Sequence, residues 1–239
     1  MTNIKSNKVW VFIQARYSST RLPWKVLMKL SWKEILYHIV DRCLKWGFDK
    51  SNIFVLTSNE KSDDLIDNFC KKNNINCFRW SLNNVLERFY KCWKKNWFEY
   101  IFRLTWDNPL CNINISQLEY LKENNNKYLY INECWTIWTW VELIKFSELE
   151  EAYLNTTSID EKEHVTLYTR KKNKSYEINN FKTSYRLTID EKKDFELLNI
   201  IYEYFYRTWS LINIYDVIKY LDKNKNISII NKNIVQKKT

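Results

Sequence analysis

Three cations and three hydroxyl groups follow the first apolar run of this 239-residue chain. The cations are Arg16, Arg21 and Lys25, and the hydroxyls belong to residues 18–20. The apolar run, residues 9–15, is typical of a buried parallel strand, and ligands of open α/β sheets bind beyond the carboxyl ends of such strands. The segment therefore predicts a site for a triphosphate, with an ordinary basic surface loop as the alternative. It is not a Walker A loop, because the spacing G-x-x-x-x-G-K-[ST] is absent.

Apolar periodicities along the chain alternate between those of strands and those of helices. The expected strands cover residues 9–15, 53–57, 77–79, 100–105, 128–132, 141–145 and 185–189, the last returning to the sheet. The expected helices cover residues 35–44, 65–70, 85–93, 148–154, 194–206 and 214–221. This alternation predicts an α/β fold with a Rossmann-like, doubly wound, mostly parallel mixed sheet. We expect one domain over residues 1–225 and a polar, basic tail over 226–239.

Composition narrows the class of protein. A hydrophobic fraction of 45% and a charged fraction of 28% fit a soluble globular protein. No apolar run approaches the roughly 20 residues that span a bilayer, so we expect a cytoplasmic protein. The six cysteines form no C-x-x-C pair and only two histidines accompany them, which disfavours structural zinc. The net charge of +10 would suit nucleic acid, but the lysines are spread along the whole chain, which makes a nucleic-acid-binding module the weaker alternative.

Glycine is almost missing from the sequence. Gly47 is the one glycine and stands beside twelve tryptophans, whereas a domain of this size carries glycine at about 7% of its positions. Trp97 follows an expected helix where a C-cap glycine is usual, Trp32 stands at an expected helix start, and three more tryptophans crowd a turn at 135–140. We predict that most of the twelve are glycine in the living protein, because its host reads UGA as glycine. UGG codons there would instead indicate an aromatic-rich protein that stacks bases or sugars.

Motifs along the chain share one resemblance. Residues 13–27 match I-Q-A-R-x-x-S-T-R-L-P-G-K-V-L except for Trp24 in the place of glycine. Further matches lie at 79–88, 103–110, 141–142, 163–166 and 186–195, with tryptophan again in glycine positions at 80 and 106. The chain thus resembles the cytidylyltransferases that make CMP-activated acidic sugars (the acylneuraminate and CMP-KDO synthetases), especially the branch of spore-coat polysaccharide synthesis. The resemblance covers about residues 9–206 and implies a fold of the nucleotide-diphospho-sugar transferase type.

The resemblance also implies a reaction. A hydroxyl of a sugar, expected to be an acidic 3-deoxy-2-keto sugar, attacks the α-phosphate of CTP and pyrophosphate leaves. Arg16, Arg21 and Lys25 would neutralise the phosphates. Asp107 and Asp190 would hold Mg²⁺ as the cofactor, since this ion prefers oxygen ligands. The implied catalytic residues are therefore Arg16, Arg21, Lys25 and Asp107.

The resemblance implies two binding sets as well. The nucleotide-binding set is Gln14, Ala15, Arg16, Ser19, Arg21, Lys25, Ser81 and Arg88. The sugar-binding set is Arg103, Glu142, His164 and Arg186. An arginine of this set would pair with the sugar carboxylate, whereas His164 reads equally well as a structural histidine. Two residues depart from the family pattern: Asn84 stands where an acid is common, and Leu167 stands where proline is usual. Because of Asn84, the contacts of its segment with the base are not decided by the resemblance.

A glycosyltransferase of similar fold, which would consume a nucleotide sugar, is the nearest rival. Such enzymes typically carry a D-x-D metal motif after a strand, whereas this chain has Asp107-Asn108-Pro109. The expected partners are CTP and a sugar, with neither nucleic acid nor membrane, and a homodimer through residues 134–170 stays open.

Overall fold

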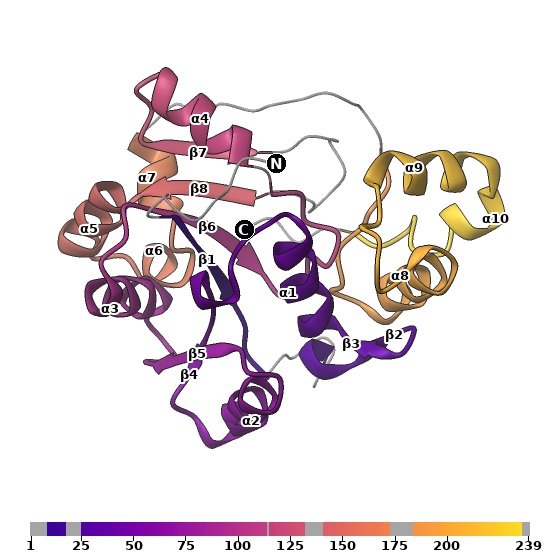
Figure 1. Ribbon diagram of the computed structural model, residues 1–239, viewed down its shortest axis with the longest axis horizontal. Helices are drawn as coiled ribbons and strands as arrows, with labels where there is room; N and C mark the ends of the chain where they lie inside the picture. The colour runs from indigo at the N-terminus through magenta and orange to yellow at the C-terminus, as the bar shows by residue number, and fades with distance from the viewer. Residues whose placement is uncertain (1–8, 18–24, 114, 132–140, 173–183, 236–239) are drawn as a thin grey trace.

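The structure is a computed structural model that describes residues 9–17, 25–113, 115–131, 141–172 and 184–235. Figure 1 shows a twisted central sheet with α3, α5, α6 and α7 on one side and α1, α8 and α9 on the other. The predicted α/β fold with a mostly parallel, doubly wound mixed sheet is confirmed.

The described residues form a six-stranded sheet with the order β5-β4-β1-β6-β8-β7. Its strands are β1 (Val9–Gln14), β4 (Ile53–Ser58), β5 (Asn76–Trp80), β6 (Tyr100–Thr105), β7 (Tyr128–Ile131) and β8 (Val141–Lys145). The first four strands in this order are parallel, while β8 runs antiparallel to both β6 and β7. A small hairpin, β2 (Lys29–Leu30) and β3 (Lys33–Glu34), stands apart from the sheet.

The helices cover both faces of the sheet. They are α1 (Ile35–Lys45), α2 (Asp64–Lys72), α3 (Val85–Asn96), α4 (Ile115–Glu123), α5 (Phe146–Asn155), α6 (Ile159–Glu163), α7 (Leu167–Lys172), α8 (Lys192–Phe205), α9 (Ile214–Lys223) and α10 (Lys225–Ser228), together with the short 3-10 helices η2 (Lys25–Leu27), η3 (Lys50–Asn52) and η4 (Lys61–Asp63). None of the helices in the described part of the chain is long and apolar enough to cross a membrane.

Strand β1 is buried on both faces and contributes side chains to two hydrophobic cores, one on each side of the sheet. Its side chains alternate between the faces, as they do in any strand. Val11 and Ile13 pack into the core formed with α1, α2, α4, α8 and α9, whereas Phe12 packs into the core formed with α3 and α5. Burial on both faces is the condition that favours a continuous apolar strand. Of the described cysteines, Cys43, Cys70, Cys92 and Cys111 are buried and Cys77 is half-buried, and all five are free thiols.

Helix α3 begins and ends at residues that the sequence singled out. The Asn84 side chain caps its first turn by accepting from the backbone N–H of Glu87 at 2.9 Å, a role for which asparagine and aspartate are equally suited. The helix ends at Trp97, whose φ of 53° lies in the left-handed region that favours glycine. The expectation of a glycine-type C-cap at 97 therefore agrees with the backbone.

Two expectations about local structure are wrong. Residues 185–189 are not a strand of the sheet, because the backbone N–H of Ile189 donates to the carbonyl of Asp107 beyond the end of β6. Trp32 does not start a helix but follows Ser31 in the turn between β2 and β3, and α1 begins only at Ile35. Residues 185–189 are held by a contact distant in sequence, whereas Trp32 lies in a local hairpin.

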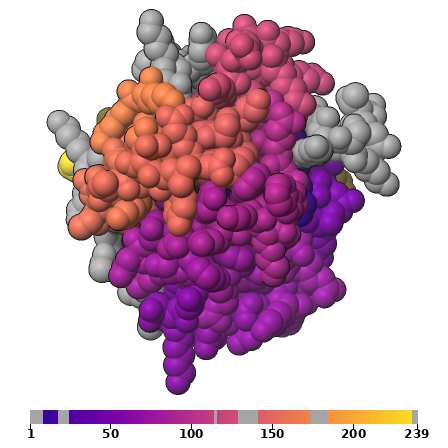
Figure 2. Space-filling model, turned by 90° about the vertical axis from the view of Figure 1, so that its left-hand side faces the viewer, coloured from indigo at the N-terminus to yellow at the C-terminus, as the bar shows by residue number. Residues whose placement is uncertain are grey.

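The segments after β8 and after α9 add cover to the domain. Helices α5, α6 and α7 pack on one another and against α3, and Figure 2 shows this orange segment as one continuous piece of surface. The expected C-terminal tail begins inside α10. Ser228 and Asn231 within it are buried, and Ile227 packs against the larger core.

Candidate active site

A pocket of about 160 Å³ opens beyond the carboxyl ends of β1 and β6. It is lined by Gln14, Ala15, Arg16, Lys25, Leu82, Val85, Arg88, Thr105, Trp106, Asp107, Glu163, His164 and Asp190. Strand β1 lies between β4 on one side and β6 on the other, so the strand order reverses at this point. Open α/β sheets bind ligands at such switch points.

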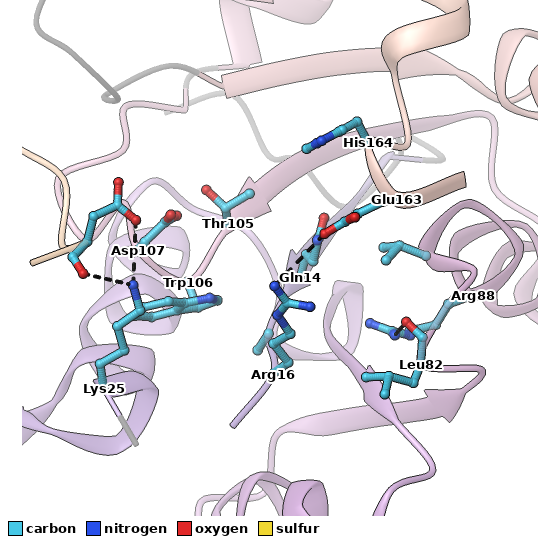
Figure 3. Close-up of a pocket in the computed structure, with 13 residues that line it drawn as sticks. Gln14, Arg16, Lys25, Leu82, Arg88, Thr105, Trp106, Asp107, Glu163 and His164 are labelled. Carbon is cyan, nitrogen blue, oxygen red and sulfur yellow. Dashed lines mark hydrogen bonds and ion pairs between the residues drawn. The ribbon is translucent and has the colours of Figure 1, made fainter. Parts of the chain in front are cut away.

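One end of the pocket carries Lys25 together with the carboxylates of Asp107 and Asp190, and Figure 3 labels the first two of these residues. The Lys25 ammonium is 3% exposed, donates to the Ile189 carbonyl at 3.0 Å and lies 3.5 Å from Oδ1 of Asp190. Burial, and then the neighbouring charge of Asp190, raise the pKa of the Asp107 carboxyl. Trp106 closes this end with its ring centroid 4.4 Å from the lysine nitrogen. The arrangement concentrates charge of both signs, which suits phosphate and cation chemistry.

Asp190 reaches this end because residues 186–194 lie across the end of β6. The Thr188 hydroxyl and the Ile189 N–H both donate to the Asp107 carbonyl, at 3.1 and 2.9 Å. Behind them, the Arg186 guanidinium donates to Oδ2 of Asp190 at 2.9 Å and to Oδ1 of Asp194 at 2.8 Å. Burial alone would lower the pKa of Arg186, but Asp194 and Asp190 outweigh it and raise that pKa.

Asp194 is the centre of this buried group. It is fully buried at the third position of α8 and accepts from the backbone N–H groups of Asp190 and Glu191 at 3.1 and 2.9 Å. The side-chain amide of Asn231, beyond α10, donates to it at 2.8 Å. Asn231 thereby ties the C-terminal segment to Asp194. Arg186 joins Asp194 to Asp190, which is the carboxylate near Lys25.

The other end of the pocket is less charged. Ala15, Leu82 and Val85 supply apolar surface there. The Arg88 guanidinium is 2% exposed and donates to the Ser81 carbonyl at 2.7 Å, which holds the loop before α3. Burial lowers the pKa of Arg88 to about 10. This end offers a hydrophobic slot with backbone groups on its rim.

The open side of the pocket lies under the end of α6. Arg16 and Glu163 face each other across it, with 3.9 Å between the guanidinium nitrogen and the carboxylate oxygen. Both side chains are about half exposed, so this ion pair contributes little to stability. His164, the residue that ends α6, lines the same side. Arg16 is therefore available to an anionic ligand.

Most of the predicted site residues meet in this pocket, but not all. Those on its wall are Gln14, Ala15, Arg16, Lys25, Arg88, Asp107, His164 and Asp190. Ser81 reaches it only through its carbonyl bond to Arg88, while Arg103, Glu142 and Arg186 lie behind it in buried ion pairs. Ser19 and Arg21 fall outside the described residues.

The structure adds residues that the sequence reasoning did not assign to the site. Glu163, Thr105 and Trp106 line the pocket although they were quoted only as parts of matched motifs. Asp63, behind the pocket, is buried and accepts from the backbone N–H of Tyr17 at 2.7 Å and from the Thr57 hydroxyl at 2.8 Å. It thereby ties the chain that leaves β1 to the end of β4.

The fold and the pocket define a nucleotidyltransferase of the nucleotide-diphospho-sugar type. A family model described as Cytidylyltransferase matches residues 10–234. The chain belongs to the cytidylyltransferase family, as the sequence resemblance predicted.

Relatives agree with this assignment. The spore coat polysaccharide biosynthesis protein SpsF of Bacillus subtilis is 30% identical over 82% of this chain and 87% of its own length. The structure of a cytidylyltransferase from Leptospira borgpetersenii is 30% identical, with a TM-score of 0.82, and covers 97% of this chain and 100% of that one. A CMP:2-keto-3-deoxy-manno-octonic acid synthetase complexed with CTP shares the fold, with a TM-score of 0.59, 14% identity, and coverage of 83% and 99%.

Proposed function

We propose that this enzyme transfers CMP from CTP to an acidic 3-deoxy-2-keto sugar and releases pyrophosphate. The observation that carries the proposal is the meeting of Lys25, Asp107 and Asp190 at one end of a pocket whose other end is apolar. A nucleoside triphosphate has the same polarity, with its phosphates at one end and a flat base at the other. The similarity to SpsF, a spore coat polysaccharide biosynthesis protein, supports a role in the synthesis of a surface polysaccharide or glycan.

The proposed reaction is an in-line displacement at phosphorus. An oxygen of the sugar hydroxyl forms a bond to the α-phosphorus of CTP, and the bond from that phosphorus to the bridging oxygen breaks. Pyrophosphate leaves with the electron pair, and the hydroxyl proton passes to solvent or to a basic group. Such chemistry depends on positioning and on neutralisation of charge. Lys25 and Arg16 would carry positive charge to the leaving phosphates, as would Arg21.

The carboxylates fit a divalent cation. Burial and then the charge of Asp190 raise the pKa of the Asp107 carboxyl, and a cation between the two side chains would relieve the repulsion between them. In the described residues no group of three or more ligating side chains is found, but Mg²⁺ is commonly held by one or two carboxylates together with phosphates and water. We propose that both aspartates hold Mg²⁺, which when bound would neutralise phosphate charge.

The acidic sugar is supported by the cations on the open side. Arg16 is half exposed there beside His164, and a guanidinium is the preferred partner of a carboxylate. Activity in the cytoplasm is part of the proposal, and a homodimer stays a prediction that light scattering of the purified protein would test.

We further propose that most of the twelve tryptophans are glycine in the living protein. The left-handed φ of Trp97 supports this, as does the 77% exposure of its indole. Mass spectrometry of the protein from its own host tests the substitution, because each glycine lowers the mass by a fixed step. An unshifted mass would contradict it.

Nucleotide binding tests the proposed function. The protein used carries glycine or tryptophan at the twelve positions as mass spectrometry has established. Thermal unfolding is measured with CTP, UTP, ATP, GTP and nucleotide sugars, each with Mg²⁺. We expect CTP to raise the unfolding temperature more than the other nucleotides do. In Asp107→Asn and in Lys25→Met, CTP should raise it only slightly. The matched control is Asp216→Asn, which removes an exposed acid from the first turn of α9. Stronger stabilisation by nucleotide sugars than by any triphosphate would instead favour a glycosyltransferase.

A further inference from the structure

We propose that Arg103 and Glu142 act as positioning residues that turn the side-chain amide of Gln14 into a hydrogen-bond donor toward the base, and so select CTP over UTP. The inference rests on the proposed function and adds a determinant of its nucleotide specificity. It also gives Arg103 and Glu142, which lie behind the pocket wall, a role other than contact with the sugar.

The device begins with a fully buried carboxylate. Glu142 on β8 has no exposed surface and accepts from the hydroxyls of Tyr128 and Thr166, both at 2.6 Å on Oε1. Its other oxygen accepts from the Arg103 guanidinium. Burial raises the pKa of Glu142, but Arg103 and then Arg170 outweigh burial and leave that pKa lowered. The carboxylate is therefore ionised and holds Arg103 in one place.

Arg103 in turn reaches the pocket wall. It is paired with Phe12 in the register of β6 and β1, so its side chain shares a sheet face with Phe12 and with Gln14 two residues further on. One guanidinium nitrogen donates to Glu142, and the other donates to Oε1 of Gln14 at 3.0 Å. The arginine is 5% exposed, so bulk water scarcely competes for these bonds.

This bond decides which end of the Gln14 amide faces a ligand. An amide group usually can turn over, since it carries a donor and an acceptor of similar size. Arginine has donors only, so the oxygen of Gln14 must face Arg103 and the NH₂ group must take the other side. Gln14 lines the pocket. The wall therefore presents a donor whose orientation cannot reverse without loss of a charged hydrogen bond.

The polarity of the pocket brings a base toward this donor. Phosphates belong beside Lys25 and the aspartates, which leaves the base to the end where Leu82 and Arg88 lie (Figure 3) and where Val85 begins α3. Cytosine offers acceptors at O2 and N3, whereas N3 of uracil carries a hydrogen. Opposite N3, a fixed NH₂ group finds an acceptor in cytosine but meets another donor in uracil, whereas O2 accepts in both bases. A buried donor left without an acceptor weakens binding by about tenfold to a hundredfold.

The test compares dissociation constants for CTP and UTP with Mg²⁺, by calorimetry on the full-length protein. The unaltered protein should bind CTP at least about tenfold more tightly than UTP. Gln14→Glu replaces the donor by an acceptor and should lower this ratio by at least about tenfold. Added negative charge weakens both nucleotides alike, so it cancels in the ratio. Gln14 is partly exposed, which makes a failure of folding unexpected.

A second variant separates positioning from simple packing. Arg103→Lys keeps a positive charge for Glu142 but puts a single nitrogen on a flexible stem in place of a rigid fork, so it does not hold Gln14 in the same orientation. We expect the CTP to UTP ratio to move toward one while the protein still binds CTP. An unchanged ratio in both variants would overturn the inference and leave the proposed function standing. Absence of binding by every triphosphate would overturn the proposed function and this inference with it.

Discussion

Replacement of Asp194 by alanine tests whether the buried group behind Asp190 holds this part of the domain together. The carboxylate accepts from two nitrogens of Arg186, from two backbone N–H groups and from Asn231. Arg186 is 5% exposed and would lose its ion pair with Asp194 while it keeps the one with Asp190. Breaking a buried pair by removing one partner costs about 3–5 kcal/mol.

For a chain of this length each kcal/mol lowers the melting temperature by about 2–4 °C, which gives an expected decrease of about 6–20 °C. The assay is thermal unfolding followed by circular dichroism, with urea unfolding to obtain the free energy. Asp216→Ala is the matched control, since Asp216 is an exposed acid in the first turn of α9 and its loss should cost at most about 1 kcal/mol. Equal destabilisation of the two variants would refute the reasoning about the buried group.

Three further predictions concern charge and backbone. The pKa of Glu142 is lowered in the folded state, so the contribution of its ionised form to stability is present at neutral pH and is lost as pH falls through that lowered pKa. Urea unfolding at a series of acidic pH values should show this loss of stability. The Glu142→Gln variant should not show it. Since the pKa of Asp107 is raised, Mg²⁺-dependent CTP binding should strengthen from acidic toward neutral pH, and a binding titration of Asp107→Asn should show no such rise. Trp97→Gly should increase the free energy of unfolding by about 1 kcal/mol, because φ at residue 97 is 53° and glycine takes such an angle without cost. Trp46→Gly, at a C-cap with a right-handed backbone, should bring no such increase. An increase at both positions would argue against the backbone explanation.

Much of the fold could be predicted because apolar periodicity reports which faces are buried. The strand at 100–105 and the helix from Val85 coincide with β6 and the start of α3. Residues 185–189 have a comparable apolar pattern, but Thr188 and Ile189 donate hydrogen bonds to the carbonyl of Asp107. A local pattern does not distinguish the hydrogen bonds of a β-ladder from a few hydrogen bonds to a distant loop.

The site was predictable where a matched motif contains or follows the end of a strand. Gln14, Lys25 and Asp107 lie on the pocket wall because motif and topology agree about them. Arg103 and Glu142 were expected to bind sugar, together with His164 and Arg186, and the structure places both behind the pocket wall in an ion pair. Their direction depends on the register between β6 and β8, which pairs them with each other. Register across a sheet is decided by turns and tertiary packing.

The account's central claim is CMP transfer, and product analysis tests it most directly. The protein, in the form that mass spectrometry establishes, is incubated with CTP, Mg²⁺ and a panel of 3-deoxy-2-keto sugar acids. We predict a CMP-sugar and pyrophosphate in equal amounts with at least one of these acids, and neither product with Lys25→Met. Consumption of a nucleotide sugar with release of free nucleotide, and no CMP-sugar from CTP, would contradict the claim.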